Sequence, residues 1–257
     1  MTWTTERDGP LAVVTLDAGG LNLFDETVFA GLEDAVAGLE TEIPRGVLFR
    51  AEGKFVSAGV DVKVFDAIAD VAEAARLWKR LVAVPQRLEA LPCPTIFAAH
   101  ALCLTAAFEL ALGCDLILAS ESARFGLVER VVGLTPAMGG TQRLVERAGP
   151  ARARELVYTG ELFGARTLES WNVVNRVLPD EGFAEAARAF AFGIAQGPTV
   201  AHAATKTLVR AALDGGIRAA DELVPEVAGG LFATEDLQGA VTSFLTDGPG
   251  KASFSGR

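Results

Sequence analysis

The sequence is 257 residues long and carries 33 Asp and Glu residues against 23 Lys and Arg residues, which gives a formal net charge of −10 at pH 7. Half of the residues are hydrophobic and 22% are charged, which excludes intrinsic disorder, because a disordered chain has low apolarity and high charge density. The acidic balance argues against nucleic acid as a partner, since binding to phosphates needs clustered Lys and Arg. It argues equally against an anionic membrane surface.

Cysteine usage and hydropathy indicate where the chain resides. Cys93, Cys103 and Cys114 show no CxxC spacing, and an odd number of cysteines forms no disulfide framework. Scattered cysteines among apolar residues are typical of a reducing compartment. The polar segment 1–10 has no hydrophobic region of a signal peptide, and no apolar run reaches the roughly 18 residues of a transmembrane helix. We therefore expect a cytoplasmic protein with no membrane association.

Strand and helix patterns alternate in the first half of the chain. Short apolar runs bounded by turn residues predict strands over residues 11–16, 47–50, 95–99 and 116–119. Apolar residues spaced by three and four predict helices over residues 25–39, 72–91 and 105–112. We expect Pro85 to bend the second of these helices.

Helices dominate the last part of the chain. After residue 141 the only strand pattern covers 173–177, and helix-like segments cover residues 143–147, 151–158, 183–192, 201–213, 221–227 and 235–245. The pattern predicts an α/β core of repeated strand–strand–helix units over residues 1–197. A helical C-terminal extension over residues 198–257 follows, and we expect an irregular tail from residue 246.

Several common kinds of catalytic site are missing from the sequence. It contains no GxxxxGK[ST], no GxGxxG after a strand, no HExxH and no GxSxG. Its only histidines are His100 and His202, so a histidine-based triad or metal site is not expected. We interpret both histidines as structural and predict no metal site.

Two segments carry candidate chemistry in the first half of the chain. Small residues 57–59 follow a predicted strand, and such a turn exposes backbone N–H groups that can bind an anion. In the second segment, 100–115, Thr105 can cap a helix in which Glu109 shares a face with Ala106. Because its neighbours are apolar, the Glu109 carboxyl is expected to be desolvated, which raises its pKa toward a value useful for proton transfer.

A third segment, 123–143, places Glu129 in a Val-rich stretch before a Gly/Pro loop. Each feature alone also has a plain explanation. Glu109 could lie exposed on a surface helix or pair with a buried Arg. Glu129 could form a solvated pair with Arg130, and 57–60 could be an ordinary tight turn.

In their order and spacing these segments resemble the enoyl-CoA hydratase/isomerase (crotonase) family. The resemblance runs from residues 11–16 through GKFVSAGVDVK, CLTAAFELALGCDLILA and ARFGLVERVVGLTPAMGGTQRL to the closing KASFSGR. The SAGxD-x-K turn and the FG-x-x-E…GGTQRL run are specific to that family. The resemblance implies a crotonase-type spiral whose helical extension serves oligomerisation, in a homotrimer or a dimer of trimers.

The resemblance also implies roles for individual residues. Family members bind an acyl-CoA thioester and stabilise an enolate-like anion with two backbone N–H groups, here those of Val60 and Ala106. Unpaired N–H groups at helix starts suit that task. The matching catalytic carboxylates are Glu109, expected to activate water, and Glu129, expected to exchange a proton at Cα. Being close, they would titrate as a pair.

The CoA part of the substrate is expected to contact Ala58, Val60, Asp61, Val62 and Lys63. Lys251 matches a C-terminal lysine near a CoA phosphate, in a neighbouring subunit. No cofactor is expected, because coenzyme A is part of the substrate.

The sequence departs from the family pattern around the pocket. Thr105-Ala106-Ala107 replaces three glycines and narrows the site, Val128 replaces a proline, and Ala137 replaces a glycine. Both glutamates remain, so the expected function is an enoyl-CoA hydratase, a hydro-lyase acting on a 2-enoyl-CoA. The alternatives are another reaction on acyl-CoA, by a double-bond isomerase, hydrolase, decarboxylase or C–C lyase, and a non-catalytic acyl-CoA-binding subunit.

Overall fold

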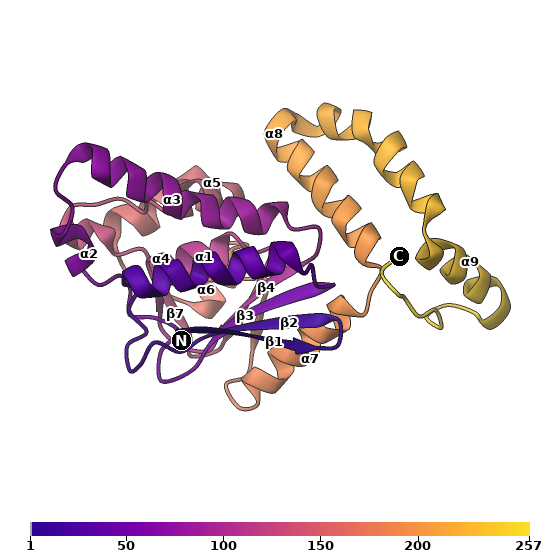
Figure 1. Cartoon of the computed structure of the whole chain (residues 1–257), viewed down its shortest axis with the longest axis horizontal. Helices are drawn as coiled ribbons and strands as arrows, with labels where there is room; N and C mark the ends of the chain where they lie inside the picture. The colour runs from indigo at the N-terminus through magenta and orange to yellow at the C-terminus, as the bar shows by residue number, and fades with distance from the viewer. Residues whose placement is uncertain (1) are drawn as a thin grey trace.

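A six-stranded sheet lies at the centre of the computed structural model, which describes residues 2–257 (Figure 1). The strand order is β1-β2-β3-β4-β6-β9, antiparallel between β1 and β2 and parallel elsewhere. The strands span Trp3–Asp8 (β1), Leu11–Leu16 (β2), Gly46–Ala51 (β3), Thr95–Ala99 (β4), Leu116–Ser120 (β6) and Arg176–Leu178 (β9). A small second sheet joins β5 (Cys103–Leu104), β7 (Arg124–Gly126) and β8 (Phe163–Gly164).

Helices cover both faces of the large sheet. The α-helices span Glu26–Thr41 (α1), Lys63–Asp66 (α2), Val71–Ala90 (α3), Ala106–Leu112 (α4), Gly140–Thr159 (α5), Ala165–Ser170 (α6), Phe183–Ala195 (α7), Thr199–Gly230 (α8) and Glu235–Asp247 (α9). Two 3-10 helices span Glu129–Val132 (η1) and Leu231–Ala233 (η2). In Figure 1, α1 and α3 lie on one face and α7 on the other, while α8 and α9 extend to the side.

Alternate residues of the central strands point to opposite faces of the sheet. In β2, Leu11 and Val13 pack in a cluster with Ala187 of α7, whereas Ala12 and Val14 belong to the larger core under the helices of the other face. Because helices cover both faces, the parallel strands are continuous apolar runs in the sequence. This explains why four of the strands were easy to predict.

Most predicted elements are confirmed, one predicted strand is misplaced, and four strands were not predicted. β1 gave no strand pattern because the interior of this edge strand is exposed and polar, and β5, β7 and β8 are only two or three residues long. The strand predicted over 173–177 begins only at Arg176, since Val173 and Val174 are buried residues of the loop that precedes it. Pro85 lies inside α3 without ending it.

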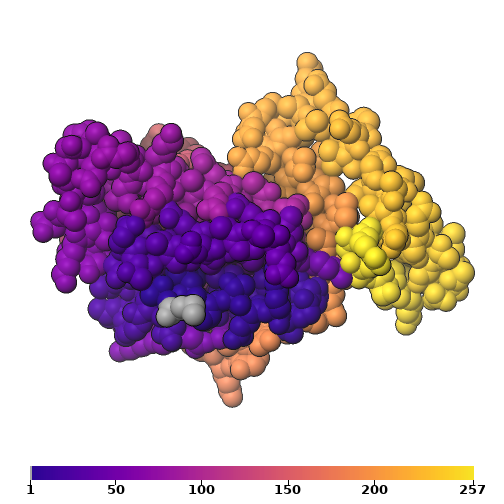
Figure 2. Space-filling model, in the orientation of Figure 1, coloured from indigo at the N-terminus to yellow at the C-terminus, as the bar shows by residue number. Residues whose placement is uncertain are grey.

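The C-terminal helices α8 and α9 form a separate lobe, here called the C-terminal lobe (Figure 2). Charged side chains connect it to the core. Lys206 of α8 donates to Asp115 at 2.9 Å and to the carbonyl oxygen of Leu88 at 3.0 Å. The tail after α9 has no helix or strand, as predicted, and Asp236 accepts the N–H group of Gly256 at 2.9 Å. The division of the chain after residue 197 stays a prediction.

Over residues 2–257, no helix is both long enough and apolar enough to cross a membrane.

Candidate active site

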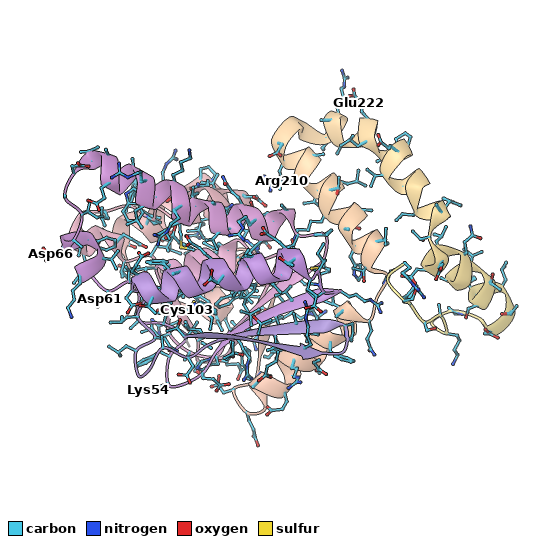
Figure 3. All side chains as sticks on the ribbon, viewed as in Figure 1. Lys54, Asp61, Asp66, Cys103, Arg210 and Glu222 are labelled. Carbon is cyan, nitrogen blue, oxygen red and sulfur yellow. The ribbon has the colours of Figure 1, made fainter. Side chains whose placement is uncertain are left out.

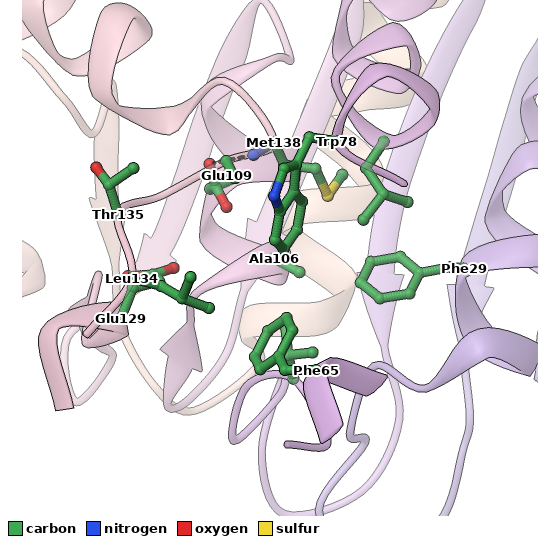
Figure 4. Close-up of a pocket in the computed structure, with 12 residues that line it drawn as sticks. Phe29, Phe65, Trp78, Ala106, Glu109, Glu129, Leu134, Thr135 and Met138 are labelled. Carbon is green, nitrogen blue, oxygen red and sulfur yellow. Dashed lines mark hydrogen bonds between the residues drawn. The ribbon is translucent and has the colours of Figure 1, made fainter. Parts of the chain in front are cut away.

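One pocket contains both predicted carboxylates and both predicted backbone donors (Figure 4). It contains about 330 Å³ of space, part of which is open to solvent. Its walls come from α1, α2, α3, α4, the loop before α2 and the segment from η1 to α5. The lining residues are Phe29, Val60, Phe65, Trp78, Leu81, Ala106, Glu109, Glu129, Leu134, Thr135, Ala137 and Met138. Apart from the two glutamates and Thr135, these side chains are apolar.

The loop that carries Val60 is fixed by bonds to its neighbours. The N–H of Phe24 donates to the carbonyl oxygen of Gly59 at 2.9 Å, and the carbonyl oxygen of Phe24 accepts the N–H of Asp61 at 3.0 Å. Gly59 has φ +116°, a conformation that favours glycine, and its N–H donates to the hydroxyl of Ser57. Within residues 2–257, no acceptor is present for the N–H of Val60, so this donor is free for a ligand.

The second donor begins helix α4. The N–H of Glu109 closes the first turn on the carbonyl oxygen of Thr105 at 2.8 Å, and the N–H of Ala106 finds no acceptor in the described chain. Because it is the first N–H of a helix, it lies at the positive end of the helix dipole.

Thr105 does not cap α4 with its side chain, so that prediction is wrong. A capping residue normally has an extended backbone that directs its oxygen to the N–H groups of the first turn. Thr105 instead has φ +46° and ψ −120°, and no side-chain capping bond forms. Its hydroxyl is buried and lacks a partner among the described residues.

Glu109 is buried, with 3% of its surface exposed, which overturns the alternative of an exposed helix position. Its Oε1 accepts the N–H groups of Met138 at 2.9 Å and Gly140 at 2.8 Å. Burial, and next the proximity of Glu129, raises the pKa of Glu109 to about 8, against the opposing effects of the two N–H groups and Arg143. No salt bridge to Glu109 occurs in the described chain, so the alternative of a direct Arg partner is wrong as well.

Glu129 is the first residue of η1, and its Oε2 is buried without a hydrogen-bond partner in the part of the chain described. Burial raises the pKa of Glu129 to about 7. Arg130 does not pair with it, because the Arg130 guanidinium donates to the carbonyl oxygen of Thr159 at 2.8 Å. The alternative of a solvated Glu129–Arg130 pair is therefore wrong.

The structure places the predicted CoA-binding residues in two regions. Ala58, Asp61, Val62 and Lys63 flank the pocket on the loop before α2 and on its first residue, and Val62 and Lys63 are exposed. The tail after α9, which carries Lys251, lies beside the C-terminal helices (Figure 1), whereas Asp61 is labelled at the other end of the molecule (Figure 3). One copy of the chain therefore does not bring Lys251 to its own pocket.

Known proteins resemble this chain along nearly its whole length. The sequence model described as "Enoyl-CoA hydratase/isomerase" matches residues 6–255. The chain belongs to this family. A relative named "Probable enoyl-CoA hydratase echA8" from Mycobacterium bovis is 30% identical over 250 residues, which cover 95% of this chain and 96% of the relative. The short-chain-enoyl-CoA hydratase of Clostridium acetobutylicum is 29% identical over 243 residues, 93% of each chain.

The fold is also that of the family. A crystal structure described as enoyl-CoA hydrates subunit I from Geobacillus kaustophilus superposes with a TM-score of 0.91 at 30% identity, covering 100% of this chain and 99% of the other. The predicted crotonase-type α/β fold with its helical C-terminal extension is therefore confirmed.

In this member of the enoyl-CoA hydratase/isomerase family, three aromatic residues that line the pocket could not be predicted from the sequence. Phe29, Phe65 and Trp78 come from three different helices and line the pocket together with Met138 (Figure 4). Each looked like an ordinary apolar residue of its own segment, and no spacing connects them. In residues 2–257, no cluster of three or more His, Cys, Asp or Glu residues could hold a metal ion.

Proposed function

We propose that this protein is an enoyl-CoA hydratase, which adds water across the 2,3 double bond of a 2-enoyl-CoA thioester. The observation that carries the proposal is that two carboxyls with pKa values of about 8 and about 7 line the same pocket as two unpaired backbone N–H groups. A hydration needs a base for water, an acid for Cα and donors for the thioester oxygen. The four residues supply these three functions.

In the proposed reaction, the carboxylate of Glu109 takes a proton from water while the water oxygen bonds to Cβ. The electron pair of the double bond moves toward the thioester oxygen, where the N–H groups of Val60 and Ala106 stabilise the enolate. Glu129 then donates its proton to Cα. Loss of one such oxyanion donor typically costs about 2.7–4 kcal/mol of transition-state stabilisation.

The two carboxyls are proposed to share one proton near neutral pH. Because each carboxyl is desolvated and Glu129 further raises the pKa of Glu109, two negative charges in the pocket are disfavoured. A pair with one proton contains an acid and a base at the same time. Their pKa values are close, at about 8 and about 7, so moving the shared proton from one carboxyl to the other through water costs only on the order of 1 kcal/mol.

The surroundings support an acyl-CoA substrate. The apolar walls of the pocket suit an acyl chain, and the exposed Lys63 begins α2, the helix that contributes Phe65 to those walls. We propose that CoA contacts residues 58 and 60–63 of one copy and Lys251 of a neighbouring copy. The reaction requires no cofactor beyond the CoA of the substrate, and we expect it to take place in the cytoplasm.

A homotrimer or a dimer of trimers is part of this proposal. The C-terminal helices expose large apolar side chains that a partner copy would cover, among them Leu213, Ile217, Phe244 and Leu245. Size-exclusion chromatography tests the assembly, since elution at the chain mass of 26.9 kDa would contradict it.

The decisive experiment is incubation of the purified protein with crotonyl-CoA, followed by the loss of the absorbance of the conjugated thioester. The hydratase proposal predicts turnover that Glu109→Gln and Glu129→Gln each reduce by at least about 100-fold. Absence of turnover across several chain lengths would refute it and would favour a non-catalytic acyl-CoA-binding subunit. A double-bond shift that survives in Glu109→Gln would favour an isomerase instead.

A further inference from the structure

A buried arginine lies directly behind the loop that binds Glu109. Arg143 of α5 has 7% of its surface exposed. Its Nε and Nη2 donate to the two carboxylate oxygens of Glu89 in α3, at 2.6 and 2.7 Å. Its Nη1 donates to the carbonyl oxygen of Gly139 at 3.2 Å. Such a forked contact fixes the guanidinium in one orientation.

The Gly139–Gly140 turn is held between this guanidinium and the Glu109 carboxyl. A Cβ at Gly139 would lie 2.0 Å from Nη1 of Arg143, and a Cβ at Gly140 would lie 2.7 Å from Cγ of Glu109. Neither position has room for a side chain. A movement of Arg143 would therefore displace the turn whose Gly140 N–H binds Oε1 of Glu109.

A third charged group connects this cluster to the C-terminal helices. Arg210 of α8 donates from Nη1 to Oε2 of Glu89 at 3.2 Å, and Figure 3 shows it on the side of α8 that faces the core. Glu89 thus accepts from two arginines, and its negative charge partly offsets the positive charge of Arg143.

We propose that Arg143, fixed by Glu89 and Arg210, is the positioning residue of Glu109. It holds the Gly139–Gly140 turn, so that Oε1 of Glu109 stays bound and Oε2 remains directed toward the pocket. Its positive charge also favours the ionised form of Glu109. The consequence for turnover rests on the proposed function, whereas the orientation and titration of Glu109 do not.

The charged groups around Glu109 allow a test based on the direction in which the titration midpoint of Glu109 moves when one of them is removed. Glu129 faces it from η1 and Arg143 from α5, with Glu89 of α3 and Arg210 of α8 behind Arg143. The thiols of Cys103 and Cys114 stay neutral, because burial raises their pKa values far above 8. Removing the positive charge of Arg143 should stabilise protonated Glu109. Removing the negative charge of Glu89 leaves Arg143 uncompensated and should stabilise ionised Glu109.

The titration is followed by infrared spectroscopy on the full-length protein, using the protonated-carboxyl band that is missing in Glu109→Gln. We expect Arg143→Gln to move the midpoint of Glu109 upward by about one pH unit and Glu89→Gln to move it downward. Arg210→Gln, at a half-exposed position, should shift it upward by less, and it provides a second test if Arg143→Gln fails to fold. The control is Arg152→Gln, an exposed arginine of the same helix that pairs with Glu155.

Arg143→Lys separates charge from geometry. It keeps the positive charge but loses the forked contact, so the midpoint should stay in place while kcat for crotonyl-CoA falls at least about tenfold with little change in KM. Shifts of the same sign in Arg143→Gln and Glu89→Gln, or midpoints equal to that of Arg152→Gln, would overturn the proposal. If the wild-type protein does not turn over an enoyl-CoA, the infrared midpoints still decide it.

Discussion

Arg130 follows Glu129 in the sequence, yet its Nη1 lies 2.8 Å from the carbonyl oxygen of Thr159 and makes no salt bridge to Glu129 among residues 2–257. The half-buried Glu129 therefore has no salt bridge to Arg130 that would stabilise its charge, and its Oε2 is buried without a partner among residues 2–257. This explains why burial raises its pKa to about 7. With Glu109 at about 8, the pocket contains two carboxyls that titrate near neutral pH.

These two titrations predict a narrow pH optimum. We expect kcat/KM for crotonyl-CoA to be highest between pH 7 and 8, where the pair contains one proton. It should fall below about pH 7, as the second proton removes the base, and above about pH 8, as the last proton removes the acid. Rates measured from pH 5.5 to 9.5 in one mixed buffer provide the test. A flat profile over that range would show that the pair does not control the reaction.

The same burial makes Glu109 costly to the folded state at high pH. Its pKa rises from 4.5 to about 8 on folding, so the folded state binds the proton more tightly than the unfolded state. The stability that Glu109 contributes is present below pH 4.5 and is lost as the pH rises toward 8. Glu109→Gln keeps a side-chain oxygen that can accept the N–H groups of Met138 and Gly140. Because glutamine does not ionise, the variant does not lose stability as the pH rises.

We therefore expect Glu109→Gln to raise the melting temperature. The free energy of unfolding should increase by the order of a few kcal/mol at pH 9 and hardly at all at pH 5. Calorimetry at the two pH values measures the difference. Glu155→Gln, an exposed glutamate of α5, is the control and should show no such pH dependence. A gain of equal size at both pH values would mean that the side-chain shape and not the charge is responsible.

The sequence predicted four of the parallel strands, the long helices and the desolvated Glu109 because each is a local pattern, whereas the catalytic role of Glu129 was predicted from the resemblance to the family. Val47–Arg50 lies within β3, and Glu109 in an apolar helix is indeed buried. Features that depend on contacts between distant segments were not predictable. Arg143 and Glu89 are 54 residues apart, and nothing local shows that they meet behind the pocket.

Thr105 is the clearest conflict between the sequence and its local backbone. A β-branched residue at φ +46° is strained, at a cost of about 1–3 kcal/mol, and its buried hydroxyl has no partner in the described chain. Thr105→Gly should relieve both penalties. Against this, glycine makes the unfolded chain more flexible, which lowers the free energy of unfolding by about 0.4–1 kcal/mol. We expect a net gain of about 1 kcal/mol, or a melting temperature higher by about 2–4 °C.

Thermal unfolding measures this gain, and Thr207→Gly is the matched control. Thr207 is an exposed residue inside α8, where glycine should destabilise the helix by a few tenths of a kcal/mol to about 1 kcal/mol. If Thr105→Gly lowers the melting temperature as Thr207→Gly does, Thr105 is not strained.

The buried carboxylate of Asp236 provides a way to test the proposed role of Lys251. Asp236 accepts the N–H groups of Ser255 at 2.6 Å and Gly256 at 2.9 Å, and it thereby fixes the tail that carries Lys251. Asp236→Ala should release the tail, which limited trypsin digestion detects as faster cleavage after Lys251. If Lys251 contacts a CoA phosphate of a neighbouring copy, the KM for crotonyl-CoA should rise about two- to five-fold, the range of an exposed ion pair, with kcat unchanged.

Lys251→Ala should raise KM by the same factor, and the double variant should show no further increase, because both substitutions remove one contact. Asp247→Ala is the control, since its exposed carboxylate accepts, among residues 2–257, only from the hydroxyl of Ser243, at 3.2 Å. A freely cleaved tail in Asp236→Ala together with an unchanged KM would remove Lys251 from the CoA site and leave Lys63 as the one cation among the predicted CoA-binding residues.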